Sequence, residues 1–245
     1  MRSMRLVSFV YLFAGGIVLQ TALADGLIYQ LPTDGGSVTF DYEYKATGTA
    51  DDPTVDIRKG SLTMSSVGET TVYNEKCRWI EFKEVLKWEY DGKERVTITK
   101  VLVPENHLGR GKSPGEHLIQ GWVKFGDSAP QEFHDLRSPL VAAQGLFLAG
   151  PPKEVKDLKQ TEINGKLGIL QCEGVTGQFV EEQEGGNVYR TFENRLHSTA
   201  PFGVVVSLWK IERRDNKGAI LEAGTVKFTL RDTQNSALSE MPEKK

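Results

Sequence analysis

The order of apolar and polar residues along the chain is mostly that of β-strands. In residues 37–45, SVTFDYEYK, large apolar or aromatic side chains alternate with polar ones. A period of two places each set on one face of a half-buried strand. The sequence therefore predicts a strand here whose buried face is formed by Val38, Phe40, Tyr42 and Tyr44.

Turn signals separate further segments of this kind. Residues 77–90, CRWIEFKEVLKWEY, match strand and helix templates almost equally well, but Asp91-Gly92 and the β-branched run that follows favour one long hairpin over 77–103. Glycine-containing turns at 126–127, 185–187 and 216–218 join other strands. Those strands are predicted in 117–125, 166–175, 177–183, 187–197, 204–214 and 220–232.

One segment interrupts the strands. Ser138 fits a helix N-cap and Pro139 the first turn, and residues 140–149, LVAAQGLFLA, are apolar on nearly all sides before Gly150 and two prolines. A helix this apolar must be buried on most sides. We expect a buried helix over roughly 139–149 and a second, more exposed helical turn in residues 153–160, KEVKDLKQ.

Together these elements predict a mainly β protein. We expect a single curved antiparallel sheet, an open or half barrel, with the helix at 139–149 against its concave face. Residues 25–235 are predicted to form one β-rich domain, and residues 236–245 a polar, flexible tail.

The first residues have the order of a secretory signal peptide, predicted to span 1–24. Arg2 and Arg5 precede an apolar run, 6–19, and Ala22-Leu23-Ala24 is a cleavage signature. The run is shorter than the about 20 apolar residues that a membrane-spanning helix needs. We therefore expect cleavage after Ala24, a mature chain without a transmembrane segment, and a periplasmic or secreted location.

The charge of the chain argues against nucleic acid as a partner. The formal net charge is −3, and cleavage of the signal peptide would remove two arginines and no acidic residue. A mildly acidic surface lacks the positive patch that phosphate backbones or anionic lipid surfaces attract.

The two cysteines, Cys77 and Cys172, both lie in the exported part of the chain. In an oxidising compartment an even pair is read first as a disulfide, which over so long a loop would stabilise the fold by roughly 4–5 kcal/mol on the chain-entropy model. The alternative is two separate buried thiols, since a free cysteine packs as a small hydrophobic residue.

The sequence contains no convincing catalytic motif. GKSPG, residues 111–115, matches the nucleophile-elbow pattern with Ser113 as nucleophile, but the following residue is Pro114, which has no N–H to offer an oxyanion hole. His107, His117 and His134 border the same loop region without the close spacing of a metal site. We expect no cofactor, no metal and no catalytic residue.

A candidate ligand-binding wall begins at residues 198–212, STAPFGVVVSLWKIE. This strand starts apolar on both faces, and Gly203 permits a bulge or tight bend just before it. This pattern has two interpretations. It is either the ordinary start of a buried strand or the edge of an apolar cavity between the sheet and the helix. The cavity wall predicted on the second interpretation consists of Phe202, Val204, Val206, Leu146, Phe147 and Leu148.

The segment RTFENRLHSTAPFGVVVSLWKIE resembles a turn in exported bacterial proteins of the LolA/LolB-like half-barrel superfamily, the outer-membrane lipoprotein carriers. The mature chain also resembles a set of small secreted bacterial proteins of unknown function with segments like GLIYQLP, EKCRWIEFK and APFGVV. The first resemblance implies an open β-barrel with an apolar cavity partly filled by a helix, in a superfamily whose members carry lipids or lipidated proteins. No arginine here matches a lipoprotein-binding position.

Three hypotheses of function follow. The first is an exported, non-catalytic protein that binds a lipid or a lipidated partner, such as a lipoprotein, in an apolar cavity. The second is a structural or interaction module of the cell envelope, in which the same residues are plain core. The third is a hydrolase with its site in the loop region 104–135.

Overall fold

The protein is described by a computed structural model that covers residues 26–47, 55–112, 114–134, 152–183 and 185–241. The expected signal peptide, the predicted helix at 139–149 and the wall residues Leu146, Phe147 and Leu148 lie outside these ranges. Among the described residues, no helix has the length and apolar character needed to cross a bilayer.

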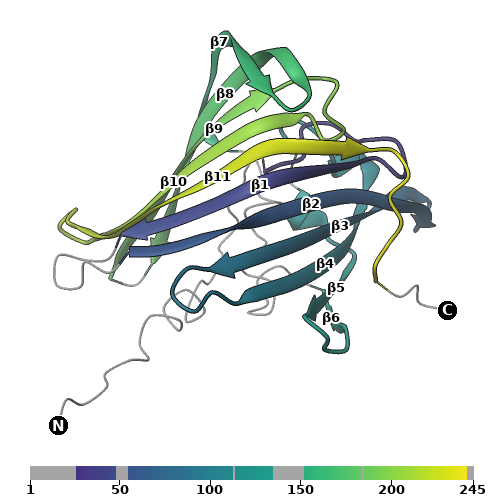
Figure 1. Cartoon of the computed structure of the whole chain (residues 1–245), viewed down its shortest axis with the longest axis horizontal. Coiled ribbons are helices and arrows are strands. Elements are labelled where there is room, and N and C mark those ends of the chain that lie inside the picture. The colour runs from purple at the N-terminus through teal and green to yellow at the C-terminus, as the bar shows by residue number, and fades with distance from the viewer. Residues whose placement is uncertain (1–25, 48–54, 113, 135–151, 184, 242–245) are drawn as a thin grey trace.

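The described residues form one antiparallel sheet of 11 strands (Figure 1). Two short 3-10 turns, η1 (Glu105–His107) and η2 (Pro114–His117), lie between β4 and β5. The strands are β1 (Ser37–Thr47), β2 (Val55–Val72), β3 (Glu75–Trp88), β4 (Glu94–Pro104), β5 (Gln120–Phe125), β6 (Gln131–Phe133), β7 (Lys153–Gly165), β8 (Gly168–Gln183), β9 (Gly186–Leu196), β10 (Val204–Asp215) and β11 (Ile220–Gln234).

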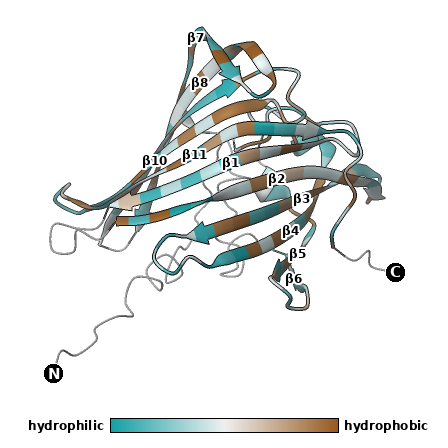
Figure 2. Cartoon of the chain, viewed as in Figure 1, coloured by the Kyte–Doolittle hydropathy of each residue, from teal (hydrophilic) through white to brown (hydrophobic). Residues whose placement is uncertain are grey.

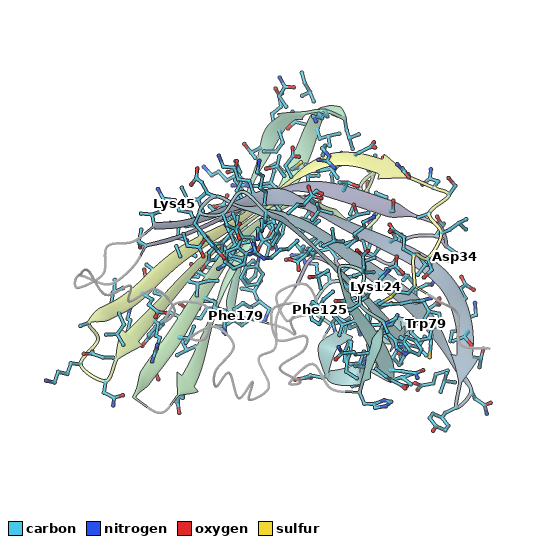
Figure 3. All side chains as sticks on the ribbon, turned by 60° about the horizontal axis from the view of Figure 1, so that its bottom comes forward. Asp34, Lys45, Trp79, Lys124, Phe125 and Phe179 are labelled. Atoms are coloured by element: carbon cyan, nitrogen blue, oxygen red, sulfur yellow. The ribbon has the colours of Figure 1, made fainter. Side chains whose placement is uncertain are left out.

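The strand order places the first and last strands side by side in the middle of the sheet. The order is β6-β5-β4-β3-β2-β1-β11-β10-β9-β8-β7, so neighbours are hairpins except at the pairing of β1 with β11. The two edge strands, β6 and β7, follow each other along the chain. Figure 3 shows the sheet bent into an arch, which confirms the prediction of one curved, open antiparallel sheet.

The buried residues follow the pleat. Figure 2 shows apolar and polar bands alternating along the strands, as a period of two requires. In β1 the predicted face of Val38, Phe40, Tyr42 and Tyr44 is at most 9% exposed. These residues belong to one apolar cluster with Phe82 of β3 and Phe192 of β9. The main core is therefore on the concave face, between the two arms of the arch.

Two glycines in the sheet, each covered by an aromatic ring, allow the sheet to curve. A Cβ on Gly121 of β5 would lie 2.4 Å from the ring of Phe133, and a Cβ on Gly177 of β8 would lie 2.7 Å from the ring of Phe192. Glycine kinks covered by an aromatic side chain are a known device for curving sheets. One such pair occurs on each arm.

Two elements differ from the sequence-based expectation. The predicted helical turn at 153–160 is wrong, because these residues belong to β7, which pairs with β8 through two register shifts. The strand β2 was not predicted, although it pairs with β1 and β3 over most of its length. Tertiary pairing decides both segments, since neither has a clean period of two.

The predicted disulfide is also wrong. Cys77 and Cys172 are both free and both buried. Cys77 lies in β3 and Cys172 in β8, on different arms of the arch. Cys172 belongs to the main apolar cluster, whereas the pleat directs Cys77 to the face opposite Phe82. The alternative of two separate thiols describes the structure.

Part of the segment predicted as a flexible tail lies against the outer, convex face. The Ser239 hydroxyl donates to Glu81 Oε2 at 2.7 Å, and Glu240 N donates to the other oxygen of that carboxylate at 3.0 Å. Met241 is 4% exposed. Residues 236–241 therefore follow the outer surface of β3, and residues 242–245 lie outside the described part of the chain.

Candidate functional site

The concave face carries two groups of contacting aromatic rings. Tyr42 of β1 stacks on Phe228 of β11 with ring centroids 4.9 Å apart. On the neighbouring strands Trp209 lies 5.3 Å from Phe192 and 5.8 Å from Phe179. Aromatic pairs at such distances add about 0.5–1.5 kcal/mol beyond the burial of their surface. We call the second group, Phe179, Phe192 and Trp209, the aromatic wall; both groups belong to one buried apolar cluster.

The predicted wall residues in β10 and just before it are packed in the same apolar cluster as these rings. Phe202 and Val204 are fully buried, at 0% exposure, and Val206 is half-buried against the same apolar cluster. The bulge expected near Gly203 is present as a register shift between Val204 and Val206. Since Leu146, Phe147 and Leu148 are outside the described residues, half of the predicted wall stays a prediction.

An N-terminal segment, Leu27–Leu31, packs on the residues around Phe202. Leu27, Ile28 and Tyr29 are 0%, 3% and 8% exposed, although they belong to no strand. Tyr29 N donates to Phe202 O at 2.9 Å. The sequence analysis missed this contact, and the signal was present as the apolar run Leu27-Ile28-Tyr29 just after the expected cleavage site.

Close packing at Gly203 accompanies this contact. Gly203 has a φ of +85°, a conformation that costs a side-chain-bearing residue about 1–2 kcal/mol. A Cβ there would lie 2.9 Å from the Cβ of Tyr29. The tight turn expected before β10 therefore shapes the surface on which the N-terminal segment lies.

A polar pair lies inside this apolar region. Asn194 of β9 is fully buried, and its Nδ2 donates to the hydroxyl of Tyr29 at 3.0 Å. The amide oxygen Oδ1 of Asn194 is buried and has no hydrogen-bond partner. A buried polar atom without a partner costs about 1–3 kcal/mol. The position is thus chemically suited to receive an N–H or O–H group.

The concave face also has a polar region on β1, β2 and β3. The guanidinium of Arg58 lies 3.5 Å from the ring centre of Trp88 and 4.7 Å from that of Tyr44. Burial, and next the nearby Glu84, raise the pKa of Tyr42 far above its usual value, so its hydroxyl stays protonated. One end of the concave face is therefore apolar and the other combines rings with charges.

Phe125 is a large apolar side chain on the concave face that is partly open to solvent. Phe125 ends β5 two residues after the buried Val123, so the pleat gives both side chains the same face. Phe125 is 41% exposed. In Figure 3 it points toward the interior of the arch from one arm, and Phe179 does so from the other. These two residues come from strands near opposite edges of the sheet.

The loop histidines come together only in part. The rings of His107 and His117 stack with centroids 3.3 Å apart, and burial together with His117 lowers the pKa of His107. His134 is exposed and lies 3.8 Å from Glu132. The ring lone pairs of two stacked imidazoles do not converge on one point. Among the described residues no group of three His, Cys, Asp or Glu side chains could hold a metal ion.

The outer face has a polar recess beneath the C-terminal segment. Its volume is about 230 Å³, and its lining includes Thr63, Ser65, Glu81 and Lys83 of the sheet and Glu240 of the C-terminal segment. Lys83 and Glu240 form an ion pair across it at 2.7 Å. The charged groups here already satisfy one another, which suits a structural contact better than a binding site.

Comparisons with known proteins give only distant matches. No protein-family model and no curated protein matches the chain. Among solved structures, a candidate exported protein with a YmcC-like fold from Bacteroides fragilis is 10% identical, with a TM-score of 0.33 over 84% of this chain and 99% of that chain. A candidate lipoprotein from Parabacteroides distasonis is 9% identical, with a TM-score of 0.33 over 86% and 100% of the two chains.

A third match is a β-barrel-like protein, a domain of unknown function, from Brucella abortus. It is 10% identical, with a TM-score of 0.27 over 84% of this chain and 98% of that chain. The relationship to the lipoprotein-carrier superfamily that the sequence resemblance implies is not shown by these matches.

Proposed function

We propose that the chain is an exported, non-catalytic protein that binds an amphipathic molecule on its concave face, either a lipid or the lipid part of a lipidated protein. The acyl part packs against the aromatic wall of Phe179, Phe192 and Trp209. The polar part lies toward the rings and charges around Arg58 and Trp88.

The partly exposed Phe125 is the observation that carries this proposal. Phe125 is 41% exposed although the pleat directs it, like the buried Val123, to the interior of the arch. It lies opposite Phe179, which is itself part of the aromatic wall. An exposed ring that faces a buried apolar surface is the arrangement expected where an acyl chain completes the core.

Titration with dansyl-labelled undecanoic acid, whose fluorescence rises in apolar surroundings, tests the proposal. Replacing Phe125 by serine removes a contact worth about 1.5 kcal/mol, so the Kd should rise about tenfold. Tyr73→Ser is the matched control, because Tyr73 is an aromatic residue at the β2–β3 turn and 94% exposed. Equal affinities for Phe125→Ser, Tyr73→Ser and the unmodified protein would contradict a site beside Phe125.

A second candidate is a structural or interaction module of the cell envelope. The full burial of Phe202 and Val204 supports it, since these two residues of the predicted cavity wall act as ordinary core. On this alternative the protein binds no acyl probe, and Phe125→Ser changes only solubility or partner binding. The same titration therefore separates the two candidates.

A further inference from the structure

The N-terminal segment Leu27–Leu31 is buried as deeply as a core strand, but it pairs with no strand of the sheet. Its apolar residues belong to the main core cluster together with Phe202 and Leu196. Each sheet strand beside it is fixed by a ladder of backbone hydrogen bonds, as β10 is by β9 and β11. The segment belongs to no ladder. Its removal would therefore leave the pairing of the sheet intact.

Few hydrogen bonds fix the segment, and one side chain provides much of the attachment. Backbone bonds join Tyr29 N to Phe202 O at 2.9 Å, and Arg110 N to Tyr29 O at 3.0 Å. The side-chain amide of Gln30 donates to Ala200 O at 2.6 Å and to Ser198 O at 3.0 Å. Gln30 thus anchors the segment to the turn that precedes β10.

The surface beneath the segment has the chemistry of an amphipathic ligand site. It is apolar at Phe202, Val204 and Leu196, and it carries one buried amide, that of Asn194. The Tyr29 hydroxyl accepts a hydrogen bond from this amide, whose oxygen has no partner. An acyl chain that ends in an amide or hydroxyl group could replace both the apolar and the polar contacts of the segment.

We propose that Leu27–Leu31 is an intramolecular plug that occupies the place of an acyl chain and leaves when a ligand binds whose acyl chain carries an N–H or O–H group at the end away from its polar part. The inference rests on the proposed function. The segment begins close to the expected new N-terminus at Asp25, so a free chain end of a few residues can move without straining the sheet. The plug also covers the apolar surface while the site holds no ligand.

A plug of this kind lowers the apparent affinity of the ligand. When only a fraction of the molecules is open, the measured Kd equals the intrinsic Kd divided by that fraction. Weakening the plug raises the open fraction and tightens binding, although it destabilises the folded protein. Ordinary damage to a binding site would instead lower stability and affinity together.

Gln30→Ala, compared with the unmodified chain by titration with dansyl-labelled undecanoic acid, tests the plug. Loss of the Gln30 side-chain hydrogen bonds should tighten binding by about threefold to tenfold, while the thermal midpoint falls. Gln160→Ala is the matched control, because Gln160 is exposed on the edge strand β7. It should change neither quantity. Hydrogen exchange at residues 27–31 should accelerate when the probe is added.

The outcomes separate the two proposals. If the unmodified protein binds the probe but Gln30→Ala binds no more tightly and exchange at residues 27–31 stays unchanged, the plug is refuted and the proposed function stands. If neither protein binds the probe, both proposals are refuted. Tighter binding by Gln30→Ala together with faster exchange supports the plug.

Discussion

Replacing Gly203 by alanine tests how closely the N-terminal segment packs on the turn before β10. The new side chain has two costs. The first is the positive φ of +85°, about 1–2 kcal/mol for any residue with a Cβ. The second is steric, because the Cβ would lie 2.9 Å from that of Tyr29. Moving Tyr29 weakens its hydrogen bond to Phe202, which adds about 1 kcal/mol.

Gly218 provides the control for the first cost alone. Its φ is +84°, and a Cβ there would meet nothing within 4 Å. Denaturant unfolding should therefore show a loss of about 1–2 kcal/mol for Gly218→Ala and about 2–3 kcal/mol for Gly203→Ala. Equal losses in the two variants would refute a close contact between the turn and Tyr29.

Three further predictions concern groups away from this contact. Since Cys77 and Cys172 are free and burial raises the pKa of both thiols, the thermal midpoint should be the same with and without reductant, and both should react with iodoacetamide only after unfolding. The pKa of His107 is lowered in the folded protein, so the free energy of unfolding should be higher above the ordinary histidine pKa and should fall as the pH falls below it. His107→Asn should weaken this pH dependence in unfolding measured from pH 7.5 to 5.5. Arg78→Met, which removes a 5% exposed partner of Glu69 and Glu105, should cost about 3 kcal/mol in denaturant unfolding.

The sequence predicts those parts of the fold where local signals agree with the sheet. In β1 the alternation from Val38 to Tyr44 reproduces the buried face, because half-buried strands select for a period of two. The turns before β9 and β11 contain glycines with positive φ at Gly185 and Gly218, which are strong local signals. Such signals need no knowledge of the rest of the chain.

The parts that could not be predicted depend on distant contacts. On its concave face β2 carries Arg58, Gly60 and Leu62, so no single face is apolar; Gly60 is required there because a Cβ would meet Val85 O at 1.8 Å. The charges of β7 suit a helix surface as well as an edge strand, and only pairing with β8 decides between them.

The same dependence on distant contacts applies to the candidate site, which stays a prediction. Phe202 and Val204 were identified as residues that face a covered region, and both are buried. The helix at 139–149 was predicted as their cover and lies outside the described residues. The contact of Tyr29 with Asn194 was not predicted, because the two residues are far apart in the sequence and meet only in the fold.

The central claim, that the concave face holds an acyl chain, is tested most directly by analysing what the protein carries. Protein purified after bacterial expression of the full-length chain is extracted with organic solvent, and the extract is examined by mass spectrometry beside an exported protein of similar size. The account predicts one class of acyl lipid at near-stoichiometric amount, reduced in Phe125→Ser and unchanged in Tyr73→Ser. Lipid at the level of the comparison protein in repeated preparations would contradict it.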